Sequence, residues 1–162
     1  MTKKTFNQKL HASGDLPKIA DISDQPCAEK YGNKLLIAEP MAYNDIMAKI
    51  PKGKLTTIVD IRDYLARLAG ADVTCWMTAG IFSNIVANAS AEREQNPALG
   101  DGLKPVPYWR TLKKDGELSE KYPGGISAQK ELLESEGHKV IQKGKRYFVE
   151  NYQAKLVNLN EL

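Results

Sequence analysis

The chain has 162 residues, of which 42% are hydrophobic, and these values suit one compact domain with a single core and some extension. Its 23 basic and 20 acidic residues give a net charge of +3, which permits an anionic partner without requiring one. The two cysteines and the two histidines stand apart in the sequence, without the spacing of metal ligands or of a disulfide framework. We therefore expect no metal site and no cofactor, and a reducing compartment.

The chain carries no signal for export or for a membrane. Residues 1–4 lead into polar sequence and not into an apolar signal core. No run approaches the roughly 18 apolar residues that a membrane span requires. We expect a cytoplasmic protein, associated with the nucleoid if its source is bacterial, with no membrane partner.

The N-terminal region is weakly patterned. Residues 1 to about 30 mix Lys, Ser, Gly, Asp and Pro with scattered hydrophobic residues, which is typical of a loosely ordered extension with one short turn. After them, residues 34–38 are apolar and fit either a strand or part of a first helix. A helix is predicted over 41–50, because apolar residues fall near one face and Pro51 ends the pattern.

Two further helices follow, joined by a short turn that contains glycine. Thr57 can cap a helix over 58–68, whose apolar residues recur at helical spacing. Residues 70–72 end it, and either Asp72 or Thr74 can cap the helix that follows. A helix, a short turn and a second helix form a helix-turn-helix, whose second helix is presented to nucleic acid.

The pattern changes to short extended segments after residue 104. Residues 105–112 are a predicted extended run, 113–116 a turn and 117–118 the return, which together predict a wing. A helix is predicted over 127–135, and residues 139–149 predict a basic hairpin. The sequence therefore predicts a helical region followed by small β elements.

Five short motifs, taken in order, carry a family resemblance. They read Ile-Pro-x-Gly-Lys before a Thr-rich helix start, Pro-x-x-Arg, Asp-Gly, Tyr-x-Gly-Gly and Leu-Leu-x-x-Glu-Gly. In this order, residues 45–140 resemble the C-terminal DNA-binding and active-site domain of the O-alkylguanine DNA alkyltransferases, the methylated-DNA-protein-cysteine methyltransferases. The motifs occupy residues 50–54, 107–110, 115–116, 122–125 and 132–137.

The resemblance implies a mainly α fold with small β elements, built on a winged helix-turn-helix. We expect this domain over residues 39–140. It would be preceded by a partly irregular extension over 1–38 and followed by a basic hairpin and tail over 141–162.

The resemblance also locates a reactive centre that this chain has lost. In the family the strand motif reads Pro-Cys-His-Arg, and a distant Glu orients the His so that the Cys becomes a thiolate nucleophile. Here Tyr108 stands at the Cys position and Trp109 at the His position, while Glu136 remains without the partner that it would orient. A phenol with an unperturbed pKa of about 10 is a poor nucleophile at neutral pH. The sequence predicts no catalytic residue and no enzyme.

A subset of the family, the alkyltransferase-like proteins, also lacks the cysteine yet binds alkylated DNA and recruits further repair. By alignment, the family's base-rotating Tyr falls on Ile58, and the Arg that fills the vacated base stack falls on Trp76. Trp76 can wedge or stack in place of Arg, whereas Ile58 cannot make the polar contact of Tyr with phosphate. The resemblance implies a binder of double-stranded DNA, with alkylated guanine as the lesion to test and a repair or regulatory protein as a further partner.

Residues 86–104 are longer than the link expected between the presented helix and the Pro-x-x-Arg strand. The insertion is predicted to extend the helix to Glu94 and then to form a loop. That loop covers either the old pocket or a surface no longer used for DNA.

The candidate residues divide into a DNA-contacting group and a degenerate active-site pocket. Lys113 and Lys114 at the wing tip are the better phosphate candidates, although such lysines are often only solvated. Tyr108 and Trp109 either line a lesion pocket or pack in the core, and Trp76 either contacts DNA or anchors the core. The predicted DNA-binding residues are Thr56, Thr57, Trp76, Ser83, Asn84, Arg110, Lys113 and Lys114. The predicted pocket residues are Pro107, Tyr108, Trp109, Tyr122, Gly124, Gly125 and Glu136.

Two other functions compete with DNA binding. In the first, Ile58, Trp76 and the insertion form an apolar surface, and the scaffold serves as a protein-interaction or regulatory module that no longer recognises lesions. In the second, which ranks last, Cys75 or Tyr108 accepts an alkyl group in an active enzyme.

Overall fold

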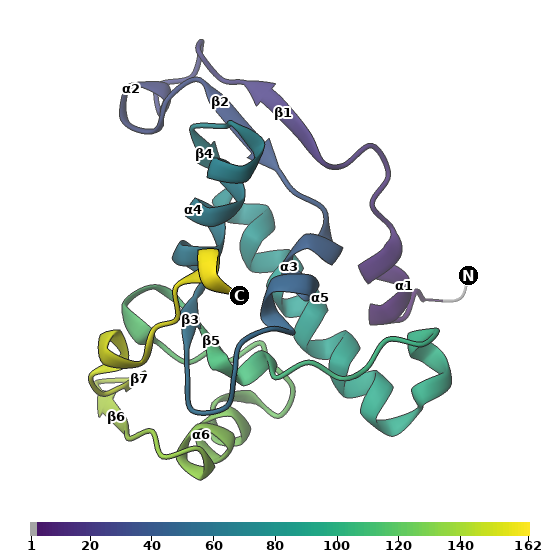
Figure 1. Cartoon of the computed structure of the whole chain (residues 1–162), viewed down its shortest axis with the longest axis vertical. Coiled ribbons are helices and arrows are strands. Elements are labelled where there is room, and N and C mark those ends of the chain that lie inside the picture. The colour runs from purple at the N-terminus through teal and green to yellow at the C-terminus, as the bar shows by residue number, and fades with distance from the viewer. Residues whose placement is uncertain (1–2) are drawn as a thin grey trace.

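One long helix, α5 (Trp76–Gln95), runs through the middle of the molecule and contacts three other helices. The structure is a computed structural model that describes residues 3–162 (Figure 1). The other helices are α1 (Phe6–His11), α2 (Ala28–Tyr31), α3 (Pro40–Met47), α4 (Ile58–Ala69) and α6 (Gly125–Ser135). The strands are β1 (Lys18–Asp21), β2 (Lys34–Ile37), β3 (Thr56–Thr57), β4 (Val73–Thr74), β5 (Thr111–Leu112), β6 (Val140–Lys143) and β7 (Arg146–Val149).

Residues 3–38 are more ordered than the sequence predicts. Helix α1 packs on the C-terminal half of α5, where the Glu92 carboxylate accepts hydrogen bonds from the backbone N–H groups of Phe6 and Asn7, both at 3.0 Å. The Asn7 side chain accepts a further bond from the buried Arg93 guanidinium at 2.9 Å. The expectation of a loosely ordered extension is therefore wrong, because polar residues that favour disorder in isolation hold α1 onto α5.

The N-terminal sheet has the strand order β1-β2-β4, with β1 antiparallel and β4 parallel to β2. Residues 34–37 are thus a strand, which resolves one alternative left by the sequence. Strand β4 lies in the turn between α4 and α5, so the helix-turn-helix and the N-terminal sheet share this segment (Figure 1).

The predicted caps of α5 are wrong, because both side chains bind elsewhere. The Asp72 carboxylate accepts hydrogen bonds from the backbone N–H groups of Asn33 and Lys34 at 3.0 and 2.9 Å. The Thr74 hydroxyl donates to the Arg62 carbonyl at 2.7 Å. Helix α5 begins after Cys75 without a side-chain cap.

Helix α4 and its cap confirm the prediction, whereas the helix predicted over 41–50 is present but ends at Met47, before Pro51 is reached. Pro40 occupies the first turn of α3, where a missing N–H costs nothing. The Thr57 hydroxyl accepts a hydrogen bond from the Asp60 N–H at 3.1 Å, as an N-cap residue should. Gly70 ends α4 in the left-handed conformation, with φ of 69°.

The predicted extended run over 105–112 is wrong in its middle, where the chain turns. Tyr108–Arg110 form a 3-10 turn, closed by hydrogen bonds such as Arg110 N–H to the Pro107 carbonyl at 3.2 Å. Thr111–Leu112 form the strand β5, which pairs in parallel with β3.

The loop of residues 111–122, which we call the wing segment, begins with β5 and turns tightly at Asp115 and Gly116. The predicted helix over 127–135 is confirmed as α6, and the predicted basic hairpin is confirmed as β6 and β7. After β7 the chain returns to the body of the molecule, where Val157 N–H donates to the Leu55 carbonyl at 3.0 Å.

The insertion confirms one prediction and resolves another. Helix α5 continues to Gln95, one residue beyond the prediction. The following loop folds back along α5, because the Arg93 guanidinium donates to the Lys104 carbonyl at 2.9 and 3.2 Å. It therefore covers the C-terminal half of α5, far along the helix from Trp76.

Two apolar clusters hold these elements together. The larger lies among α1, α3, α4 and α5 and includes the buried Met47, Ile61 and Val86. The smaller lies between α6, the hairpin and the wing segment, around Leu133. Trp109 packs against both clusters. The predicted fold class, mainly helical with small β elements and a helix-turn-helix, is confirmed.

Candidate nucleic-acid interface

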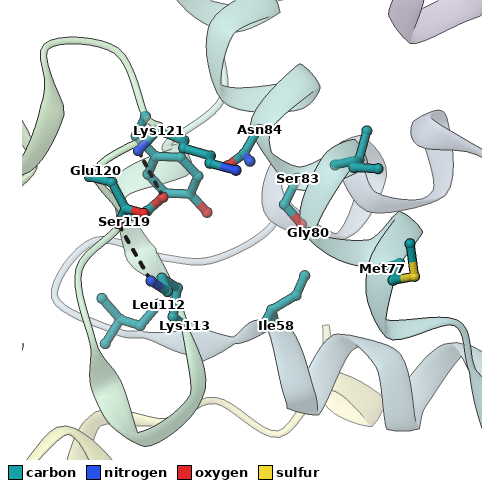
Figure 2. Close-up of a pocket in the computed structure, with 12 residues that line it drawn as sticks. Ile58, Met77, Gly80, Ser83, Asn84, Leu112, Lys113, Ser119, Glu120 and Lys121 are labelled. Atoms are coloured by element: carbon teal, nitrogen blue, oxygen red, sulfur yellow. Dashed lines mark hydrogen bonds and ion pairs between the residues drawn. The ribbon is translucent and has the colours of Figure 1, made fainter.

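A cavity of about 250 Å³ lies between the N-terminal half of α5, the start of α4 and the wing segment (Figure 2). Its position follows from the helix-turn-helix, which leaves the first turns of α5 facing the wing segment across a gap. No residue of the 86–104 insertion lines it. The lining residues are Ile58, Met77, Gly80, Ile81, Ser83, Asn84, Leu112, Lys113, Ser119, Glu120, Lys121 and Tyr122.

The two walls of the cavity differ in character. The α5 wall is largely apolar, and the side chains of Met77 and Ile81 are 69% and 54% exposed. The wing wall carries charge: the Lys113 ammonium lies 3.5 Å from a carboxylate oxygen of Glu120, and Lys121 follows in the chain. The cavity thus offers an apolar surface on one side and charged groups of both signs on the other.

An aromatic cluster surrounds Tyr108, the residue that the sequence resemblance aligns with a cysteine. The Tyr108 side chain is buried, and its ring packs edgewise on Trp109 and Tyr122, with centroids 5.4 and 5.6 Å apart. Burial raises the pKa of the Tyr108 phenol, and the negative charge of Glu94 raises it further. This phenol therefore stays protonated at neutral pH and is no substitute for a thiolate.

Tyr122 closes the cavity from behind. Its hydroxyl donates to the Thr111 carbonyl at 3.1 Å, and burial raises its pKa. Of the predicted pocket residues, only Tyr122 lines the cavity. Pro107, Tyr108 and Trp109 do not line it, and the Tyr108 ring packs against those of Tyr122 and Trp109.

The Glu136 carboxylate binds three donors from two distant segments, an arrangement that we call the Glu136 clamp. The Trp109 indole N–H donates at 2.8 Å, the Arg110 Nε–H at 2.7 Å, and the Gly53 backbone N–H at 3.3 Å. Arg110 also donates to the Ile50 carbonyl at 2.7 Å. The expectation that Glu136 had lost its partner is wrong, because the indole N–H of Trp109 occupies that role.

The clamp keeps Glu136 ionised. Burial alone would raise the pKa of this carboxyl, but the hydrogen bonds from Arg110, Trp109 and Gly53 outweigh burial and hold the pKa below its usual range. The Glu136 and Arg110 side chains are only 4% and 14% exposed. Arg110, predicted to contact DNA, is therefore held inside the protein.

Several other predicted DNA contacts are also engaged internally. Thr56 is fully buried in β3, and Thr57 is the N-cap of α4. The buried Ser83 hydroxyl donates to the Ala79 carbonyl at 2.7 Å. Burial removes the two threonines from the set of side chains that can reach a phosphate.

The remaining predicted contacts stay accessible. Asn84 and Lys113 line the cavity, and Lys114 is exposed at the turn of the wing segment. Trp76 is 41% exposed, and its ring packs on Tyr31 with centroids 5.1 Å apart. Trp76 therefore belongs to both alternatives, since it is anchored on one face and exposed on the other.

Gly124 and Gly125 shape the backbone at the start of α6. Both have positive φ, 76° and 70°, and a Cβ on Gly124 would lie 2.5 Å from the Cβ of Ala128. They support the wall that Tyr122 forms, without lining the cavity themselves.

Sequence reasoning missed Met77, Ile81 and Lys121 as candidates for the interface. Met77 and Ile81 are four residues apart, so they share a helix face, but an apolar pair at this spacing is usually core. Lys121 directly precedes the Tyr-x-Gly-Gly motif, and its position beside that motif could have identified it as a candidate.

Residues 3–162 contain no cluster of three or more His, Cys, Asp and Glu side chains that could hold a metal ion. Within the same described range, every helix is too short or too polar to cross a membrane.

Two solved structures from S. pombe are similar to this chain. One is Atl1 in complex with damaged DNA containing O6-carboxymethylguanine, and the other is ATL in complex with DNA. In each case the sequence identity is 22%, the TM-score is 0.48, and the match covers 74% of this chain and 94% of the other. No protein-family model matches the chain, and no curated protein matches it. In these structures the DNA is bound by the S. pombe proteins.

Proposed function

We propose that this protein is a non-enzymatic DNA-binding protein of the alkyltransferase-like kind. In this proposal the N-terminal half of α5 and the wing segment face duplex DNA, and the cavity between them receives a base turned out of the stack. The single observation that carries the proposal is this cavity, which lies beside the presented helix of a helix-turn-helix.

The lining of the cavity supports a base as its occupant. Ile58, Met77 and Ile81 supply apolar contacts for the faces of a flat ring, while Asn84 supplies both a donor and an acceptor for its edge. Lys113 and Lys121 stand on the wing wall, where ammonium groups attract the phosphates next to a displaced nucleotide.

The chemistry of the aromatic cluster supports a binder and not an alkyl acceptor. Tyr108 is a buried, protonated phenol. Its neighbour Trp109 carries an indole, which cannot take up a proton as the family's histidine would. Incubation with a duplex that contains an O-alkylguanine should leave the intact mass of the protein unchanged. A stoichiometric adduct would overturn the non-enzymatic assignment.

DNA binding is tested by anisotropy titration with plain and O-alkylguanine duplexes at two salt concentrations. Tighter binding to the lesion supports base capture, and equal binding with a steep salt dependence supports a general DNA binder. Gly80→Leu places a side chain into the cavity, because nothing lies within 4 Å of a Cβ at that position. This variant should lose the preference for the lesion and keep its affinity for the plain duplex, whereas Gly80→Ala should retain both.

A second function, a protein-interaction module, is favoured by the exposed apolar face of α5. Trp76, Met77 and Ile81 are all exposed, and the helix carries no cation before Arg93. In that case no DNA binding should be measurable at micromolar protein. The affinity of the protein partner should then fall on Met77→Ser and Ile81→Ser.

A further inference from the structure

The wing segment is electrically balanced when it is considered by itself. It contains three lysines and three carboxylates, and Lys113 is already paired with Glu120 at 3.5 Å and with Glu117 at 3.7 Å. Residues 139–149 contrast with it, because they carry four cations and no carboxylate. The positive charge on this side of the cavity therefore comes from the β6–β7 hairpin.

The hairpin is fixed directly against the wing segment. The Arg146 guanidinium donates two hydrogen bonds to the Glu117 carboxylate, at 2.7 and 3.0 Å. The Leu118 N–H donates to the Tyr147 carbonyl at 2.9 Å, and Glu117 pairs with Phe148 in an antiparallel bridge. The hairpin thus extends the sheet-like edge of the wing, and it is held by backbone as well as side-chain bonds.

Glu117 links the hairpin to the wall of the cavity. Its carboxylate contacts Arg146 on one side and Lys113, which lines the cavity, on the other. Arg146 neutralises the carboxylate that would otherwise repel a phosphate beside Lys113. The surface is therefore continuous from α5, across the cavity and the wing segment, to the hairpin.

The cations of the hairpin gather on one face and at its tip. The Lys143 ammonium and the Arg146 guanidinium both lie over the Phe148 ring, 5.6 and 5.1 Å from its centroid. Lys145 is exposed in the turn between the two strands. Lys143 and Lys145 have no carboxylate partner within the described residues, so their charges are available to a ligand.

We propose that the β6–β7 hairpin is a second wing, which binds the phosphate backbone of the duplex beyond the segment held by α5 and the wing segment. This inference rests on the proposed DNA-binding function and adds the surface that supplies most of its electrostatic attraction. Counterion release by these lysines would make the contact independent of sequence and of the lesion.

The test compares three double variants by anisotropy titration over a range of salt concentrations. Lys143→Ala with Lys145→Ala removes the free charges of the hairpin, and Lys143→Arg with Lys145→Arg keeps them. Lys9→Ala with Lys104→Ala is the charge-matched control, because Lys104 packs beside Arg93, roughly 25 Å along α5 from Trp76. The hairpin alanine variant should lower the slope of log K against log salt by about 1 to 2 and weaken binding equally for plain and alkylated duplexes.

The possible results distinguish a failure of the second wing from a failure of DNA binding itself. If the wild-type protein binds DNA and the hairpin alanine variant behaves like the Lys9 and Lys104 control, the second wing is disproved while DNA binding stands. An equal loss in the arginine and alanine variants would also overturn it, since charge and not shape is proposed to act. Absence of DNA binding by the wild-type protein would overturn both.

Discussion

The Glu136 clamp and the cavity beside α5 both contain polar and apolar side chains, but these are buried and paired in the clamp and face open space in the cavity. In the clamp, a carboxylate, a guanidinium and an indole are buried and bound to one another, at distances of 2.7 to 2.8 Å. In the cavity, lysines, an asparagine and apolar side chains face an open space of about 250 Å³. The polar groups of the clamp stabilise the fold, whereas those of the cavity can contact a ligand.

The segment around Trp109 has a structural role. Trp109 contacts both apolar clusters and donates to Glu136, so this segment joins the two clusters. The proposed binding cavity lies next to this joint and not within it. The following experiments test that division, beginning with the largest expected effect.

Glu136→Ala should break the clamp. It leaves the Arg110 guanidinium buried without its carboxylate, and loss of one partner of a buried ion pair costs about 3 to 5 kcal/mol. Urea unfolding measures this loss, with Glu134→Ala on the exposed face of α6 as the control. A loss below about 1 kcal/mol, within the range of exposed pairs, would show that the clamp contributes little.

Acid titration sharpens the same point. Because the folded protein holds the pKa of Glu136 below its ordinary value of about 4.3, the ionised carboxylate stabilises the fold at all higher pH. This stability is lost as the pH falls through the depressed pKa. The unfolding free energy of the wild type should therefore fall more steeply below about pH 4 than that of Glu136→Gln. Parallel pH profiles for the two proteins would contradict this assignment.

On the open side of the comparison, Lys113→Ala with Lys114→Ala should weaken DNA binding and leave the fold intact. Both lysines lie on the wing segment, and Lys114 is exposed. We expect the salt slope to fall by about 1 to 2 and the unfolding free energy to change by less than about 1 kcal/mol. Unchanged titration curves would remove the wing segment from the proposed interface.

The smallest effect is expected from Gly80→Ala, on the α5 wall of the cavity. Gly80 is an exposed position inside a helix with free space around its Cα. Alanine should stabilise the protein by about 0.5 to 1 kcal/mol without filling the cavity. Thermal unfolding measures the gain, and a destabilised variant would indicate that the backbone at Gly80 needs the freedom of glycine.

Much of the fold could be predicted because its signals are local. Thr57, Gly70 and Gly137 mark helix ends, and the hairpin around residues 143–144 has its own turn. The N-terminal region could not be predicted, since α1 depends on Glu92 and Arg93, more than 80 residues away. Local composition contains no trace of such a partner.

The candidate site shows the same limit. Of the predicted pocket residues, the motif order placed only Tyr122 in the lining of the cavity. That Trp109 would replace the imidazole at Glu136, and that Arg110 would turn inward to Ile50, required the spatial proximity of three segments. Met77 and Ile81 are also exposed, although apolar residues on one helix face usually pack in the core.

The pairing of β4 with β2 has a consequence for any shortened form of this protein. The backbone before α5 is bonded to the N-terminal sheet through Asp72 and Cys75, and Tyr31 supports the ring of Trp76. A fragment that starts at residue 39 would keep α4 and α5 but lose β1 and β2, against which the segment between these helices is held. We expect truncation there to misdirect the presented helix, even though every residue proposed to touch DNA is retained.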